Sequence, residues 1–106
     1  SNVSIEIDSS SVPLLPGAYA LAELGCIPGA AFRNLAFVDE HTRFSATVDY
    51  TRKMVMLDAQ TSGGLLMAVD ADRVDEALVS LRKSGHSFAT AIGVVIDKTD
   101  ASVHVF

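Results

Sequence analysis

The chain has 106 residues, of which 49% are hydrophobic and 20% are charged, and its formal net charge is −5. This size and composition predict one globular domain with a core of its own. The eight basic residues are scattered, which excludes the basic stripe of a nucleic-acid-binding protein. The apolar runs are too short to cross a membrane. A single cysteine excludes a disulfide within the chain and favours a cytoplasmic protein.

The first half of the chain predicts one strand followed by two short helices. Apolar and polar residues alternate over residues 3–7, as in a half-buried strand. Turn-forming proline and glycine residues precede predicted helices over residues 18–24 and 30–38. Residues 39–53 carry only a weak strand-like alternation. The apolar run 55–57 fits either a strand or a helix.

The second half of the chain has clearer patterns. The run Leu-Leu-Met-Ala-Val at 65–69 predicts a central strand covered on both faces. Asp72 is expected to cap a helix over 72–84, and strands are expected over 89–96 and 102–106. The helix face that we expect to anchor the core consists of Val74, Ala77, Leu78 and Leu81. This order predicts an α/β (α+β) fold, with a mixed, mostly antiparallel sheet and helices packed on one face.

The best candidate for a binding site is a polar, glycine-rich turn just before the predicted strand at 65–69. Paired hydroxyls and paired glycines suit an anion-binding turn, because glycines let backbone N–H groups converge on a ligand. A plain polar turn is the alternative. No lysine follows the glycines, so the segment is not a nucleotide-binding Walker A loop. The turn consists of Gln60, Thr61, Ser62, Gly63 and Gly64.

A second candidate lies on the predicted helix over 30–38. Arg33 could bind a phosphate or carboxylate through its planar guanidinium, and Asn34 could do so through its amide. The alternative is an ordinary solvated helix face. The three histidines, at 41, 86 and 104, share no metal-ligand spacing. We therefore assign no metal ligand and no catalytic residue.

Three motifs carry a resemblance to a known family. Residues 57–69 read Leu-Asp-Ala-Gln-Thr-Ser-Gly-Gly-Leu-Leu-Met-Ala-Val, residues 25–34 read Gly-Cys-Ile-Pro-Gly-Ala-Ala-Phe-Arg-Asn, and residues 91–95 read Ala-Ile-Gly-Val-Val. In order and spacing, they resemble the Asp-Pro-Gln-Thr-Ser-Gly-Gly-Leu-Leu, Pro-Gly-Gly-Thr-x-Arg-Asn and Ile-Gly segments of selenophosphate synthetase (selenide, water dikinase), in the aminoimidazole ribonucleotide synthetase superfamily. Ala59 and Ala30 depart from a proline and a glycine of that pattern.

The dipeptide Ser1-Asn2 is itself typical of a tag scar. The resemblance implies that residues 3–106 are the single C-terminal domain of a larger enzyme. The implied enzyme makes selenophosphate from selenide and ATP, with AMP and phosphate as co-products and Mg²⁺ as cofactor. Its N-terminal ATP-binding half, absent here, would carry the reactive cysteine or selenocysteine. The domain alone is therefore expected to be inactive and to bind neither ATP nor Mg²⁺ tightly.

The resemblance also implies a role and partners for the two candidate segments. Residues 60–64, with Arg33 and Asn34, would wall the active cleft and orient phosphate groups. The expected partner is the enzyme's own N-terminal domain, and the full-length enzyme is expected to be a homodimer. The alternative is a stand-alone module that binds a small anion or dimerises.

Overall fold

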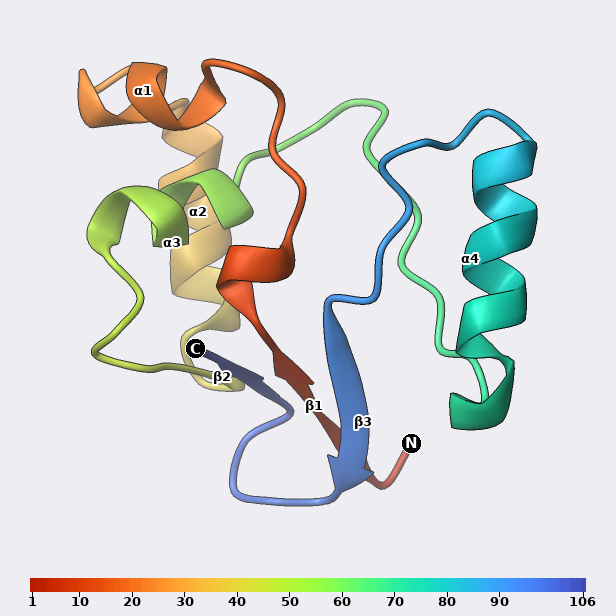
Figure 1. Ribbon diagram of the computed structural model, residues 1–106. Helices are drawn as coiled ribbons and strands as arrows, with labels where there is room; N and C mark the ends of the chain where they lie inside the picture. The colour runs from red at the N-terminus through yellow and green to blue at the C-terminus, as the bar shows by residue number, and fades with distance from the viewer.

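The computed structural model, shown in Figure 1, describes residues 1–106. Its strands form one four-stranded sheet. The strands are β1 (Val3–Ile7), β2 (Thr42–Phe44), β3 (Gly93–Asp97) and β4 (Val103–Val105), in the order β2-β4-β1-β3. The predicted α+β class with a mixed sheet is confirmed. The expectation that the sheet is mostly antiparallel is wrong, because only β1–β3 is antiparallel, whereas β1–β4 and β2–β4 are parallel.

The helices divide into a group of three and one that stands apart. They are α1 (Ala18–Glu23), α2 (Gly29–Val38), α3 (Tyr50–Met56) and α4 (Val74–Lys83), with 3₁₀ turns η1 (Ser9–Ser11) and η2 (Ala71–Arg73). Figure 1 shows α1, α2 and α3 together at the left, while α4 lies beyond β3 at the right. The helices predicted over 18–24, 30–38 and 72–84 are confirmed to within a few residues.

The structure decides one segment that the sequence left open and corrects one detail of the helix prediction. Most of the weak alternation over 39–53 is not a strand, because Asp49 caps α3 by accepting a hydrogen bond from the backbone N of Arg52 at 2.8 Å. Asp72 does not cap α4, because it lies inside the preceding turn η2 and makes no capping hydrogen bond. Local capping chemistry thus decides the start of α3 but not that of α4.

The strand predicted over 65–69 does not form. Leu65 is 85% exposed and Leu66 is 64% exposed, and residues 59–69 take part in no hydrogen bond. A strand needs a neighbour for its amide and carbonyl groups, and no strand of the sheet pairs with this run. The apolar pattern therefore indicates burial, but no other part of these 106 residues covers this run.

The hydrophobic core lies between α2 and α3 and is small. Ala31, Met54 and Leu57 are buried there, with partly buried apolar side chains around them. The expectation that Leu78 and Leu81 anchor the core is wrong, because α4 contains no buried residue. Figure 1 shows the helix beyond β3, away from the α2–α3 contact.

Strand β1 connects the two ends of the chain through a buried hydroxyl. Ser4 is fully buried. Its Oγ donates to the carbonyl oxygen of Ala101 at 2.6 Å and accepts from the backbone N of Thr99 at 3.0 Å. These bonds hold the turn between β3 and β4 against the first strand.

The antiparallel pairing of β1 and β3 requires a glycine at position 93. A side chain there would overlap the carbonyl oxygen of Glu6. We expect Gly93→Ala to lower the free energy of unfolding by about 1–3 kcal/mol, because the two strands must separate. Gly64→Ala, at a glycine with open space around it, should change it by less than about 0.5 kcal/mol. Denaturant unfolding measures both, and equal stability of the two variants would contradict the pairing.

The stability of η1 should depend on pH through Asp8. Its carboxylate accepts from Ser10 Oγ, Ser11 Oγ and Ser10 N, and these bonds lower its pKa from 3.8 to about 2. A carboxylate with a lowered pKa stabilises the fold above its unfolded pKa and loses that effect as the pH falls through the folded value. Asp8→Ala should therefore destabilise the protein at pH 6, with the difference from the parent fading between pH 4 and 2. A difference that stays constant across this range would refute the assignment.

Candidate functional site

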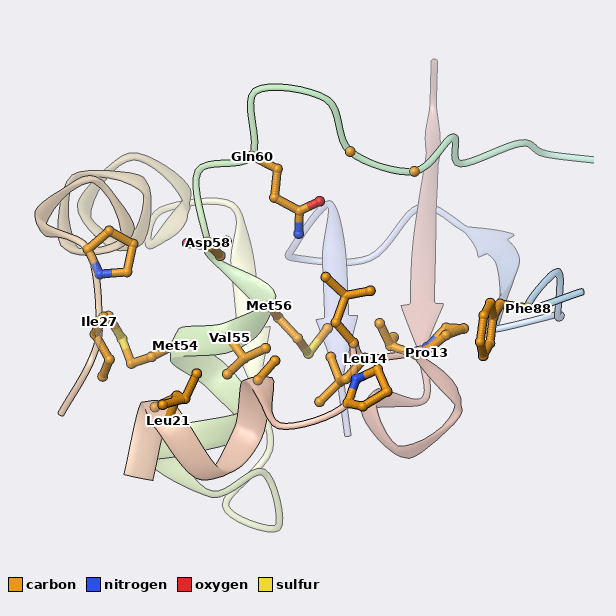
Figure 2. A pocket seen from close by; sticks show the side chains of 18 of the residues that line it. Pro13, Leu14, Leu21, Ile27, Met54, Val55, Met56, Asp58, Gln60 and Phe88 are labelled. Atoms are coloured by element: carbon orange, nitrogen blue, oxygen red, sulfur yellow. The ribbon is translucent and has the colours of Figure 1, made fainter. Parts of the chain in front are cut away.

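An apolar groove lies beside α1 and α3. Its volume is about 810 Å³, and 14 of its 23 lining residues are hydrophobic. In Figure 2, Ile27 and Phe88 lie at opposite ends of the groove, with Val55 and Met56 of α3 between them. A mostly apolar lining suits the burial of an apolar surface better than the binding of a small charged ligand.

The polar turn predicted as a binding site lies at this groove. Residues 60–64 all contribute to its lining, together with the turn Cys26-Ile27-Pro28, and the Gln60 side chain points inward from the segment above it (Figure 2). A side chain at position 63 would come within 2.8 Å of Gln60 Oε1. Gly63 therefore leaves room for the glutamine. All five residues of the turn are exposed, and the turn precedes an unpaired segment rather than a strand.

Arg33 and Asn34 do not line the groove. Arg33 is exposed, and its side chain makes no hydrogen bond or ion pair. Asn34 donates from Nδ2 to the carbonyl oxygen of Leu57 at 2.9 Å, directly after the end of α3. The amide thus fixes the point from which residues 58–64 leave the helix.

A polar cluster that the sequence analysis missed joins α1 to α3, and none of its residues lines the groove itself. Tyr19 Oη donates to Asp49 Oδ1 at 2.9 Å, which raises the pKa of Tyr19. The backbone N–H of Arg52 and this hydroxyl lower the pKa of Asp49. The Arg52 guanidinium lies 5.5 Å from the centre of the Tyr19 ring and donates to the carbonyl oxygen of Ser9 at 3.1 Å. The only signal of this cluster in the sequence is Asp49, which stands three residues before Arg52 at the spacing of a helix N-cap.

The electrostatics of the groove do not favour an anion. Asp58 is its only charged lining residue, and no lysine or arginine faces it. No group of three His, Cys, Asp or Glu side chains could hold a metal ion. The residues that line the groove do not fit a magnesium–nucleotide complex, which needs several carboxylate ligands and a cation near the phosphates.

Comparison with known proteins matches nearly the whole chain to one kind of enzyme. Selenide, water dikinase of Porphyromonas gingivalis (strain ATCC BAA-308 / W83) is 52% identical over 103 residues, which cover 96% of this chain and 29% of that protein. The same enzyme of Pseudomonas straminea is 40% identical over 93 residues, which cover 88% of this chain and 26% of that protein. No family model matches.

This chain is a homologue of the selenide, water dikinases. A third relative, selenide, water dikinase of Clostridioides difficile (strain 630), is 32% identical over 105 residues, which cover 99% of this chain and 30% of that protein. The chain thus spans about 30% of the length of the selenide, water dikinases that it matches. No helix is long and apolar enough to span a membrane.

Asn34 should matter to stability more than its neighbour does. Asn34→Ala leaves the Leu57 carbonyl without its donor, and we expect a loss of about 1–3 kcal/mol in the free energy of unfolding. Arg33→Ala, at an exposed position without partners, should change it by less than about 0.5 kcal/mol. Denaturant unfolding of both variants measures the difference. A stable Asn34→Ala protein would argue for a ligand-binding amide instead of a structural one.

Proposed function

We propose that the chain is the C-terminal domain of a selenide, water dikinase that makes selenophosphate from selenide and ATP, with AMP and phosphate as co-products. The observation that carries this proposal is the 52% identity to such an enzyme over 96% of the chain. Because these residues correspond to 29% of that relative, the groups that bind ATP and Mg²⁺ would belong to the preceding part of the polypeptide. The full-length enzyme would act in the cytoplasm as a homodimer.

The role proposed for this domain is to wall the active cleft. Residues 60–64 would face the cleft and orient phosphate groups or selenium-derived oxyanions through hydroxyl and backbone N–H donors. The positive charge that such anions require would come from the ATP-binding part, since Asp58 is the only charged residue of the groove. Arg33 could add a cation where that part covers α2. Asn34 would act as a positioning residue through its bond to Leu57.

The first test compares the 106 residues with the longest polypeptide encoded by the same reading frame. We expect the long polypeptide to form AMP in the presence of selenide, ATP and Mg²⁺, and the 106 residues alone to form none. Separation of the nucleotides by chromatography measures the AMP. A long polypeptide without an ATP-dependent activity would favour the alternative of a stand-alone module that binds small anions or dimerises.

The second test changes the turn within the long polypeptide. Gly63→Val should lower kcat more than it lowers stability, because it displaces the side chain of Gln60. Thr61→Ala should raise the KM for ATP or selenide by removing a hydroxyl donor. Ala59→Val is the matched control, because Ala59 is exposed but does not line the groove, and it should leave the kinetics unchanged. If Gly63→Val and Thr61→Ala leave kcat and KM unchanged, as the control does, the turn is purely structural.

A further inference from the structure

Strand β3 has one free edge and two exposed faces. It is the outermost strand of the sheet, paired only with β1. Val94 is 57% exposed and Val95 is 51% exposed, and successive residues of a strand point to opposite faces. Apolar side chains on both faces are typical of a strand that has neighbours and cover on each side.

The hydrogen-bond pattern shows which groups face the free edge. Asp8 N donates to Ile92 O at 2.9 Å. Bonded and non-bonded pairs alternate along an antiparallel ladder, so the opposed pair Ile5 and Val95, three steps further on, is non-bonded. In agreement, Ile5 N donates away from β3, to Ser102 O at 2.9 Å. The N–H and C=O groups of Val95 therefore point outward, along the free edge.

Apart from Asp97 at its end, β3 has none of the features that usually protect an exposed edge. Exposed edge strands are usually shielded by proline, a bulge or an inward-facing charge, whereas β3 reads Gly-Val-Val-Ile-Asp. A second stretch, residues 65–69, is also apolar and exposed, and unlike β3 it makes no hydrogen bond at all. Two uncovered strand-like segments in one small domain indicate that further backbone pairs with them.

We propose that the free edge of β3 is completed by a β-strand from the preceding part of the same polypeptide. This inference rests on the proposed function, in which about 70% of the enzyme, by the coverage of its relatives, precedes this domain. Val3 is paired with Asp97, the last residue of β3. A polypeptide that continues before Ser1 therefore enters the domain beside the C-terminal end of β3. Figure 1 shows the N-terminus beside the tip of that strand. The added segment would also cover residues 65–69.

Amide hydrogen exchange tests the proposal directly. In the 106-residue chain, the Val95 amide should exchange quickly, because it faces solvent. In the long polypeptide its exchange should slow by at least about 100-fold, because strand pairing protects it. The Val94 amide is the internal control, because its N–H faces β1 and should be protected in both proteins. Equally fast exchange of Val95 in both proteins would overturn the proposal.

A pair of variants separates strand pairing from general stability. Val95→Pro removes only an N–H that points outward, and proline is tolerated in an edge strand at such a position. In the long polypeptide it should lower the melting temperature and abolish the slow exchange of the neighbouring outward amide of Asp97. Val95→Thr keeps the N–H and should retain both properties. If Val95→Pro also unfolds the 106-residue chain, the proposal is tested by the exchange rates of the Val95 amide in the two unsubstituted proteins.

Three further outcomes are informative. Protection of Val95 that rises with the concentration of the 106-residue chain would identify a second copy as the occupant and overturn the proposal. Fast exchange in a long polypeptide that does form AMP would reject the strand but leave the proposed function standing. Slow exchange in a long polypeptide without that activity would reject the function and retain the strand.

Discussion

Arg52 joins the group of helices α1 to α3 to the turn η1, which follows β1. Its guanidinium reaches the carbonyl of Ser9 and lies over the Tyr19 ring, while its backbone N–H is held by Asp49. Ser9 N in turn donates to the carbonyl oxygen of Phe106 at the end of the chain. The Arg52 side chain thus links α1, α3 and η1, and the backbone of η1 is bonded in turn to the C-terminal residue. With only three residues in the main core cluster, such polar links carry much of the definition of the fold.

Local signals in the sequence predicted local structure well. Gly25, with φ of 86°, follows α1 as a left-handed residue, and the apolar spacing of α4 was sufficient to find that helix. The order of strands could not be read in this way, because the insertion of β4 beside β1 depends on the buried hydrogen bonds of Ser4. The run 65–69 failed for a different reason. Its pattern encodes burial, but burial needs a neighbour that these residues do not provide.

The candidate site was predictable as a segment but not as an arrangement. Residue composition alone marked the turn 60–64, and the structure brings it to a groove with the turn 26–28. The sequence could not show that the Asn34 amide is engaged by Leu57, nor that Arg33 lies outside the groove. Side chains three or four positions apart on a helix share a face, but which partner each one meets is decided by packing between distant segments.

The unbonded segment 59–69 divides the chain into two pieces that the sheet holds together. β1 and the helices α1 to α3 precede it, whereas β3 and β4, the direct partners of β1, follow it. A protease that cuts within this segment would break the covalent chain without removing a single hydrogen bond. The two halves would remain associated, as in a split protein whose fragments reassemble through strand pairing. Residues 59–69 are thus the place at which the domain can be divided into two separately expressed fragments.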